Sequence, residues 1–484
     1  MVEAAVLHHQ LTQGAWYPMG RVRHVHLVGI GGQGMAGIAE VLLRLGYRVS
    51  GSDLRAGPLS MRLAAMGATI SIGHEASQIA EADVVVYSSA VPRDNVELEE
   101  ARSRRIPVIP RAEMLGELMR FRQGIAVAGT HGKTTTTSLI AALLTQAGLD
   151  PTFVIGGRVR GMGVHARVGG GMHLVAEADE SDGSFLRLSP LVAVVTNVEP
   201  DHLENYAGDF QLLQRAFVEF VHRLPFYGLA VVCIDDPVIR SLLPELGRPV
   251  LTYGFSEDAQ IRAHDAVYQR DGMHFDVSFP GQSARTFVLH VPGRHNILNA
   301  LAALAVGFDL GLNIEHMTEA LAGFSGIERR LQTLGTITLP QGEATVVDDY
   351  AHHPSELRAT LEAIAQIRPG ERLVLVFQPH RYTRTAALLD DFAEVLATVP
   401  GLVVLLDVYA AGESPNAGKD SCALEVLLRG RHVPLERMTD VQQTLERLPG
   451  LLKHGDTVLI AGAGDVAHLA PALMERWGRE SLPT

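Results

Sequence analysis

A glycine-rich turn near residue 130 carries residue types that bind phosphate groups. It follows an apolar run at 124–128, precedes a helix-forming run at 134–146, and reads Gly129-Thr130-His131-Gly132-Lys133-Thr134-Thr135. Glycines let backbone N–H groups point at phosphate oxygens, lysine adds a compact cation, and the Thr134 hydroxyl can ligate Mg²⁺. Position 127 is valine where the general pattern has glycine, so the segment is a shorter variant. The pattern predicts a loop that binds ATP phosphates.

Lysine is rare in this chain, which makes the lysine of the turn informative. The sequence contains three lysines, at positions 133, 419 and 453, and its other basic residues are arginines and histidines. A lysine ammonium is a compact charge, whereas an arginine guanidinium is a planar fork. Lysine at position 133 therefore indicates a requirement for its geometry as well as for its charge.

Two acidic clusters follow apolar strands downstream of the turn. The first runs from Glu177 to Asp182 after a strand at 173–177, and the second runs from Asn197 to His202 after a strand at 191–196. Ligands in doubly wound sheets bind at the carboxyl ends of strands. Two carboxylate-bearing strand ends beside a phosphate loop predict a Mg²⁺ site made of oxygen ligands.

A second glycine loop, Gly29 to Gly34, follows a strand at 24–30 and fits the pattern Gly-x-Gly-x-x-Gly. Asp53 ends the next strand. This arrangement is typical of pyrophosphate binding, with the carboxylate bonded to a ribose or a base. From the residues alone, three interpretations stay open: NAD or FAD, another nucleoside diphosphate, or a tight turn without a ligand.

Histidines and arginines gather at two later strand ends. Asp348-Asp349-Tyr350-Ala351-His352-His353-Pro354 and Gln378-Pro379-His380-Arg381-Tyr382-Thr383-Arg384 each follow an apolar run. The adjacent histidines have no third partner at a spacing diagnostic of Zn²⁺. Arg381 and Arg384 can bind a phosphate or a carboxylate bidentately. Arg329 and Arg330 lie in a linker and could clamp a phosphate when domains close.

The elements that must position these residues form an α/β pattern. Short apolar strands alternate with helices at 24–87, at 124–234 and again at 344–461, which predicts parallel doubly wound sheets. Residues 105–110 contain two prolines and indicate a boundary. Alternation at 261–292 predicts antiparallel strands, and 296–311 predicts a buried helix. Helices are also expected at 385–398 and after Pro354, the latter capped by Ser355.

Composition narrows the class of protein. The chain has 484 residues, 47% apolar and 20% charged, which predicts a globular protein of two to four domains. A net charge of -13 argues against nucleic acid as a partner. Cys233 and Cys422 match no zinc or redox spacing. The sequence shows no signal peptide and no apolar stretch of about 20 residues, so we expect a cytoplasmic location without membrane association.

Seven sequence blocks, in this order, resemble the Mur ligase family over residues 21–470. They are Val28 to Gly32, Gly129 to Thr135, Glu177 to Asp182, Asn197 with Asp201-His202, Gly293 to Asn296, Asp348 to Pro354, and Phe377 to Thr385. The resemblance implies three α/β domains: a Rossmann-like domain at 1–118 for a UDP-linked substrate, a central P-loop ATPase domain at 119–326, and a C-terminal Rossmann-like domain at 327–484.

The resemblance also implies roles for single residues. Lys133 would hold the ATP phosphates. Mg²⁺ would lie among Thr134, Glu177 and His202, with Glu180 as the alternative to Glu177. The other implied contacts are ATP with Asn296, Arg330 and Asp349, the UDP-linked substrate with Gly31, Gly32, Asp53 and Ser89, and the muramoyl group or the incoming amino acid with His352, Arg381 and Arg384.

Two features depart from the family pattern. Serine is common in relatives where this chain has Gln33, which bears on a substrate contact of the first glycine loop. Several family members carry a carbamylated lysine in the central domain. That group is impossible here, because the chain has no lysine between Lys133 and Lys419.

The implied activity is amide formation driven by ATP. The resemblance is to members that join L-alanine to the lactyl carboxylate of UDP-N-acetylmuramate, a step of peptidoglycan precursor synthesis, through an acyl phosphate. His202 or His352 could take the amine proton, and Lys133 and Asp349 would complete the catalytic set. The alternatives are a ligase that adds a preformed peptide, a nicotinamide-dependent oxidoreductase with an added ATPase domain, and a nucleotide switch without catalysis. A monomer or homodimer is expected.

Overall fold

The computed structural model describes residues 19–479 except residues 89, 157–165 and 417. The described residues divide into two compact units: the first runs to Arg262 and includes 279–281 and 299–320, and the second comprises 263–278, 282–298 and the residues from 321 on. They contain three β-sheets. The predicted α/β class is confirmed, whereas the domain bounds 1–118, 119–326 and 327–484 stay a prediction. Among the described helices, none has the length and apolar character that a membrane span needs.

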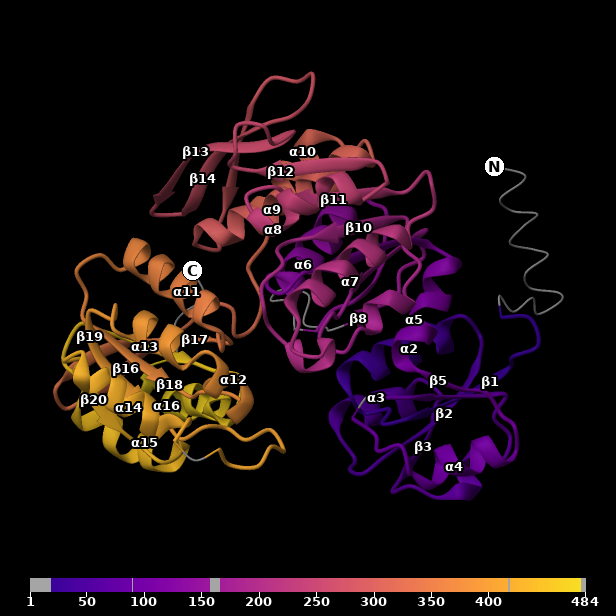
Figure 1. Cartoon of the computed structure of the whole chain (residues 1–484), viewed down its shortest axis with the longest axis horizontal. Coiled ribbons are helices and arrows are strands. Elements are labelled where there is room, and N and C mark those ends of the chain that lie inside the picture. The colour runs from indigo at the N-terminus through magenta and orange to yellow at the C-terminus, as the bar shows by residue number, and fades with distance from the viewer. Residues whose placement is uncertain (1–18, 89, 157–165, 417, 480–484) are drawn as a thin grey trace. The chain divides into compact units, whose positions relative to one another are not determined.

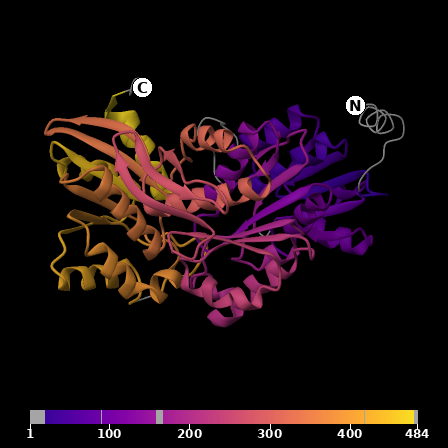
Figure 2. The same cartoon turned by 90° about the horizontal axis from the view of Figure 1, so that it is seen from above.

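The first sheet is parallel and has the strand order β3-β2-β1-β4-β5 (Figures 1 and 2, indigo to violet). Its strands are β1 (His24–Val28), β2 (Arg48–Asp53), β3 (Thr69–Ile72), β4 (Val84–Tyr87) and β5 (Val108–Pro110), and its helices are α2 (Gln33–Arg44), α3 (Pro58–Ala65), α4 (Val96–Ser103) and the short η1 (Ala76–Ile79). This is the Rossmann order, and the glycine loop follows β1 at the point where the order reverses.

The boundary predicted at 105–110 is wrong in one respect. Val108–Pro110 is strand β5, which pairs with β4 at the edge of the first sheet. Proline lacks an N–H for the ladder, so it is tolerated at an edge strand, and two prolines there mimic a linker in the sequence. The chain then continues directly into helix α5 (Arg111–Arg120).

In the first unit, the second sheet places the phosphate loop at its centre. The strand order is β12-β11-β10-β6-β9-β7-β8, so β6 lies between β9 and β10. The strands are β6 (Gln123–Ala128), β7 (Thr152–Val154), β8 (Ala166–Arg167), β9 (His173–Glu177), β10 (Val192–Val195), β11 (Leu229–Cys233) and β12 (Val250–Gly254). The helices are α6 (Lys133–Gln146), α7 (Phe210–His222), α8 (Pro237–Leu242) and the greater parts of α9 (Arg294–Asp309) and α10 (Ile314–Ala322), of which residues 294–298 and 321–322 belong to the second unit.

Helix α7 illustrates how the sequence builds this layer. Its buried side chains are Leu213, Ala216, Phe217, Phe220 and Val221, a spacing that lies on one helical face. The Asp209 carboxylate accepts a hydrogen bond from the Gln211 N–H and caps the helix start. The antiparallel strands expected at 261–292 are also present, as β13 (Ile261–Gln269), β14 (Gly272–Ser278) and β15 (Arg285–Leu289).

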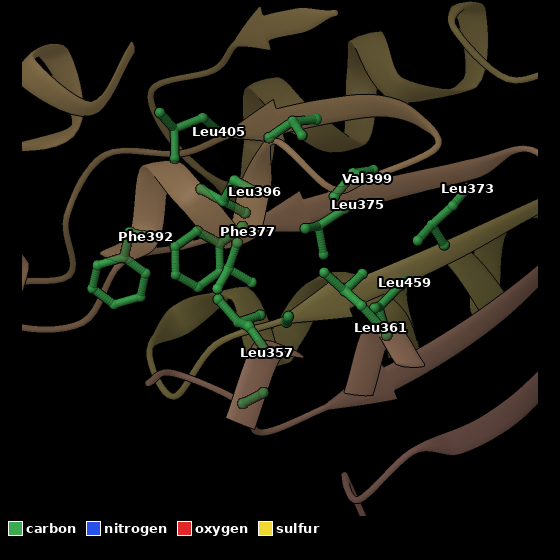
Figure 3. Packing of buried hydrophobic residues seen from close by; sticks show 14 of the residues in the cluster. Leu357, Leu361, Leu373, Leu375, Phe377, Phe392, Leu396, Val399, Leu405 and Leu459 are labelled. Carbon is green, nitrogen blue, oxygen red and sulfur yellow. The ribbon is translucent and has the colours of Figure 1, made fainter. Parts of the chain in front are cut away.

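The third sheet lies in the second unit and has the order β20-β19-β18-β21-β17-β16-β22. Its strands are β16 (Gln332–Leu339), β17 (Gly342–Asp349), β18 (Leu373–Phe377), β19 (Gly401–Leu405), β20 (Leu435–Arg437), β21 (Asp456–Ala461) and β22 (Gly478–Arg479). Helices α11 (Pro354–Ile367), α13 (Leu389–Leu396) and α14 (Ser421–Gly430) pack on one face, and α15 (Val441–Arg447) and α16 (Leu469–Trp477) on the other. In the first of these cores, Phe377 packs against Phe392 at 5.5 Å between ring centres (Figure 3).

Two local predictions for the third sheet are wrong. The helix expected at 385–398 is two helices, α12 (Tyr382–Ala387) and α13, which meet at Leu388. Helix α12 buries the charged Arg384 side chain, whereas α13 buries Phe392 in the apolar core, so the two helices pack in different environments. The cap of α11 is His353 rather than Ser355, because the His353 side chain accepts from the Ser355 N–H.

Candidate active site

The phosphate loop depends on glycine at two positions. Gly129 has φ +135°, and a Cβ there would lie 2.0 Å from the Thr196 hydroxyl oxygen. Gly132 has φ +82°, and a Cβ there would lie 2.4 Å from the Asn299 side-chain oxygen. Side chains at these positions would be strained and would also clash. The loop therefore packs its backbone against its neighbours and begins helix α6 at Lys133.

The end of β10 holds the loop in shape. The Asn197 side chain accepts a hydrogen bond from the His131 N–H at 2.8 Å and donates one to the His131 carbonyl at 3.0 Å. The Thr196 hydroxyl donates to the same carbonyl at 2.6 Å. These contacts follow from the sheet order, since β10 lies beside β6. The loop geometry is fixed by the protein itself, which reduces the ordering cost of binding a phosphate.

Lys133 is held by the loop and by an acidic strand end. Its Nζ donates to the Gly129 carbonyl at 2.6 Å and to both Glu180 carboxylate oxygens at 2.8 and 2.9 Å. Glu180 is buried. Burial lowers the pKa of Lys133, but the negative charge of Glu180 outweighs burial, so this pKa is raised above its ordinary value. The ammonium group is therefore charged at neutral pH.

The structure brings both acidic clusters to the edge of the sheet that carries the phosphate loop. Glu177 ends β9, and its carboxylate accepts from the Gly156 N–H at 2.7 Å. His202 follows β10 in a left-handed conformation, φ +54°. Its Nε2 lies 3.4 Å from the Asp201 carboxylate, and its Nδ1 lies 3.8 Å from the Glu204 carboxylate.

The chemistry of this edge fits Mg²⁺ bound through few protein ligands. Both oxygens of Glu180 bond to Lys133, whereas the Glu177 carboxylate accepts from the Gly156 N–H. Within the described chain, neither Glu177 nor His202 belongs to a group of three acidic, histidine or cysteine side chains whose ligand atoms lie within 4.8 Å of one another. Mg²⁺ commonly takes one or two protein ligands and fills its octahedron with phosphate oxygens and water.

In the first glycine loop, the predicted ribose ligand bonds to the loop itself. The Asp53 carboxylate accepts from the Gly31 N–H at 2.8 Å. The Ser52 carbonyl accepts from the N–H groups of Gly29 and Ile30, at 2.8 and 3.1 Å. Gly32 precedes α2 at its N-terminus. The end of β2 thus shapes the loop, while Ser89 lies outside the described residues.

In the second unit, the ends of β17 and the preceding linker form a cationic cluster around an aromatic ring. The guanidinium carbons of Arg329 and Arg330 lie 5.3 and 5.1 Å from the centre of the Tyr350 ring. Asp349 is buried, and its two oxygens accept from the N–H groups of Leu331 and Ala351 at 2.6 and 2.8 Å. Asp349 therefore fixes the linker that carries Arg330. Asn296, also in this unit, donates from its side chain to the Pro292 carbonyl at 2.7 Å.

His352 lies among charged and aromatic groups. Its Nδ1 is 3.3 Å from the Glu356 carboxylate and 3.1 Å from the Tyr350 carbonyl, and its ring meets that of His380 edge to face at 5.8 Å. Burial lowers the pKa of His352 to about 3, and the Arg384 charge acts in the same direction. The imidazole is therefore neutral at neutral pH.

The end of β18 adds residues that the sequence analysis did not single out. His380 stacks on Tyr409 at 5.5 Å, and the Arg384 guanidinium lies 3.5 Å from the His380 Nδ1. Arg381 begins α12 with φ +68°, and its N–H donates to the Tyr409 carbonyl at 2.8 Å. Tyr409 lies about thirty positions from these residues in the sequence, so only the folded sheet brings them together. Glu356 carried a visible signal, since it follows His352 by one helical turn.

A neutral, partly buried His352 predicts a pH-dependent stability. Its folded pKa lies below the unfolded value of about 6.5, so the unfolded chain takes up a proton first and stability falls as pH falls from about 6.5 towards 3. Between about pH 7 and about pH 5, the loss in unfolding free energy should be about 2 kcal/mol smaller in His352→Gln than in the native protein. Urea unfolding at both pH values measures it.

His432→Gln is the matched control, because His432 is an exposed histidine in the same unit. It should show the same pH dependence as the native protein. An equal loss of stability in the native protein and in His352→Gln would contradict the neutral state of His352.

The chain is similar in sequence to known ligases along most of its length. The chain is 54% identical over 469 residues to the UDP-N-acetylmuramate–L-alanine ligase of Methylococcus capsulatus, covering 96% of this chain and 98% of the relative. It is 53% identical over 458 residues to the ligase of the same name from Halorhodospira halophila, covering 94% and 93%. The chain belongs to the Mur ligase family. The resemblance predicted from the sequence is confirmed, and so is the enzyme class, a ligase.

Family models and a solved structure agree with this assignment. The descriptions "Mur ligase family, catalytic domain", "Mur ligase middle domain" and "Mur ligase, glutamate ligase domain" match residues 24–123, 127–307 and 329–464 of this Mur ligase. The crystal structure of the UDP-N-acetylmuramate–alanine ligase MurC from Thermotoga maritima has a TM-score of 0.77 at 28% identity, and covers 94% of this chain and 98% of that chain. The overall fold of the family is therefore present along most of this Mur ligase.

Proposed function

We propose that this Mur ligase joins L-alanine to the lactyl carboxylate of UDP-N-acetylmuramate and converts ATP to ADP and phosphate. The observation that carries the proposal is the 54% identity, over 96% of the chain, to a relative whose name states these two substrates. The phosphate loop supplies the means, since a carboxylate must be activated before an amine can displace its oxygen. The nicotinamide-dependent alternative has no support from the family.

The first step is phosphoryl transfer. A carboxylate oxygen of the muramoyl group attacks the γ-phosphorus of ATP in line, the bond to the β-phosphate oxygen breaks, and ADP leaves with the electron pair. The N–H groups of residues 129–135 and the Lys133 ammonium hold the phosphate oxygens and neutralise developing charge. Lys133 must exchange its contacts with Glu180 for phosphate oxygens, because its three N–H bonds point at protein acceptors in the structure.

The second step forms the amide. The neutral amine of L-alanine attacks the acyl phosphate carbonyl, and the tetrahedral intermediate expels phosphate and loses one proton from nitrogen. His202 and His352 are both candidates for the group that takes this proton. His202 lies 3.4 and 3.8 Å from the carboxylates of Asp201 and Glu204, whereas His352 is neutral but has its pKa lowered by burial to about 3. A base works best with a pKa near the working pH, so neither residue is assigned.

Mg²⁺, when bound, supplies charge neutralisation for the ATP phosphates. We propose Thr134, Glu177 and His202 as the residues that hold it. Glu177 is favoured over the alternative Glu180, because Glu180 bonds through both oxygens to Lys133. Since His202 is a candidate for both roles, substitution of Glu177 tests the metal site by itself, and substitution of His352 tests the other candidate base.

The remaining site residues are proposed as contacts of the substrates. Gly31, Gly32, Asp53 and Ser89 would hold the uridine nucleotide, and Asn296, Arg330 and Asp349 would contribute to ATP binding. Asp349 does so indirectly, because its carboxylate fixes the linker at Leu331. His352, Arg381 and Arg384 would contact the muramoyl group or L-alanine. Guanidinium groups suit this role, since they bind carboxylates bidentately.

Hydroxylamine tests the activated intermediate. Added in place of L-alanine to the enzyme with ATP, Mg²⁺ and UDP-N-acetylmuramate, its amine should attack the acyl phosphate, release phosphate and yield a hydroxamate. The iron(III) colour reaction of hydroxamates measures the product, and a reaction without ATP is the control. Amide formation with L-alanine at a normal rate, but no hydroxamate under the same conditions, would contradict an acyl phosphate route.

A further inference from the structure

A buried polar network lies beneath the first glycine loop. His26 on β1 and Glu97 on α4 are 1% and 0% exposed, and their side chains meet at 2.6 Å between Nε2 and Oε2. His74, in the loop after β3, brings its Nδ1 to 2.6 Å from the other oxygen of Glu97. Charged and polar groups are costly to bury unless each finds a partner.

The hydrogen bonds of this network require one more proton than its neutral groups supply. Four contacts join Glu97 to His26, His26 to Ser50, Ser50 to His24, and His24 to the Glu81 carbonyl, at distances from 2.6 to 2.8 Å. Each contact needs one proton between its two atoms. Two neutral imidazoles and one hydroxyl supply three protons, and both ends of the series are acceptors when Glu97 is ionised. One member must therefore carry an additional proton.

The surroundings place that proton on His26. Burial lowers the pKa of His24, which keeps that ring neutral. Burial raises the pKa of Glu97, but hydrogen bonds from His26, Ser52 and His74 outweigh burial and hold this pKa below its ordinary value. Glu97 is thus a carboxylate, and His26 faces it directly.

The other charged groups near this series act on its far end. Arg48 on β2 and Asp83 before β4 act electrostatically on His24, with opposite effects on its charge. Glu81 supplies its carbonyl to His24, and its carboxylate pairs with Arg48. None of these interactions supplies a second carboxylate to His26, so Glu97 is its counter-ion.

The network connects to the glycine loop through the end of β2. The Ser52 hydroxyl lies 3.0 Å from the His74 Nδ1, while the Ser52 carbonyl accepts from the N–H groups of Gly29 and Ile30. The next residue, Asp53, accepts from Gly31 through its carboxylate. The side chains of the network and the backbone of the loop therefore share one anchor, Ser52-Asp53.

We infer that His26 and Glu97 form a buried imidazolium–carboxylate pair that positions the first glycine loop for a uridine nucleotide. The inference rests on the proposed function for its ligand. Glu97 is a positioning residue, since it acts through His26, His74 and the end of β2 rather than on a reacting atom. Loss of the additional proton, or of the carboxylate, would leave a buried contact without its hydrogen bond and loosen the anchor.

NMR of the native protein with ¹⁵N-labelled histidine tests the protonation state directly. Near neutral pH, both ring nitrogens of His26, assigned with the His26→Asn variant, should show the imidazolium signature. In Glu97→Gln, which keeps the shape of the side chain but removes its charge, His26 should be neutral. A neutral His26 in the native protein would overturn the inference.

Binding of UDP alone, measured by calorimetry without ATP, tests the positioning. Affinity should fall about tenfold in Glu97→Gln, the size of effect expected for a lost charged hydrogen bond. Glu100→Gln, on the same helix but outside the network, should bind like the native protein. Equal affinity in native and Glu97→Gln protein would overturn the positioning role.

A wrong proposed function would give a different result from a wrong state of His26. If the native protein does not bind UDP at any pH, the uridine-nucleotide assignment is wrong, while the NMR result still decides the state of His26. In turnover assays, the positioning role predicts that Glu97→Gln raises the KM for UDP-N-acetylmuramate with little change in kcat. A change confined to kcat would contradict it.

Discussion

Lys133→Ala is expected to abolish ATP-dependent amide formation, with a loss in kcat of at least about a thousandfold. Lys133 lies at the start of α6, its ammonium group is charged, and its contacts are all to the loop and to the acidic strand end that face the phosphate site. Without it, charge developing on the γ-phosphate meets no side-chain cation from the loop. Release of ADP and phosphate from the full reaction mixture measures the effect.

The chain offers matched controls for this substitution. Lys419→Ala and Lys453→Ala remove the other two lysines, which lie outside the phosphate loop. Both variants should turn over at nearly the native rate, and Lys133→Ala should bind UDP with nearly native affinity because the first glycine loop is a separate site. Native turnover in Lys133→Ala would remove the basis of the phosphate-loop assignment.

Glu177→Gln is expected to lower turnover on the order of a hundredfold and to raise the Mg²⁺ concentration needed for half-maximal rate. Glu177 ends the strand beside β6, so its carboxylate lies at the same edge of the sheet as the phosphate loop. An amide keeps the size of the side chain but is a much weaker ligand for a hard cation. Titration of the initial rate with Mg²⁺ at saturating ATP measures both changes.

Two further substitutions make the result specific. Asp182→Asn removes one negative charge from the same acidic segment at an exposed position and should leave the Mg²⁺ dependence unchanged. Glu180→Gln removes the partner of Lys133, so it should reduce turnover without a comparable shift in the Mg²⁺ requirement. A large shift in Glu180→Gln together with none in Glu177→Gln would transfer the ligand role to Glu180.

The sequence predicted those parts of the site whose residues are contiguous. The phosphate loop and the two acidic clusters each lie within one strand–loop segment, and their meeting follows once β9 and β10 flank β6. The residues that shape the loop could not be found in this way. Asn299 lies in α9, far along the chain, and its contact with Gly132 exists only when α9 packs beside α6.

The second unit shows another limit of prediction from the sequence. His352, Arg381 and Arg384 stand out as polar residues after apolar strands, whereas Tyr409 looks like an ordinary aromatic residue until it stacks on His380. The helix break at Leu388 has no sequence signal either, because leucine and alanine favour a continuous helix and the break comes from packing. Glu97 shows the same limit, since α4 carries several glutamates and burial alone distinguishes this one.

Phosphate release with a panel of acceptors tests whether L-alanine is the substrate that this Mur ligase joins to UDP-N-acetylmuramate. The enzyme is supplied with ATP, Mg²⁺ and UDP-N-acetylmuramate, and then with L-alanine, another amino acid, or a preformed peptide that begins with L-alanine. We expect phosphate release coupled to amide formation with L-alanine, at least about a hundredfold faster in kcat/KM than with the peptide. Preference for the peptide, or phosphate release that is independent of any acceptor, would contradict it.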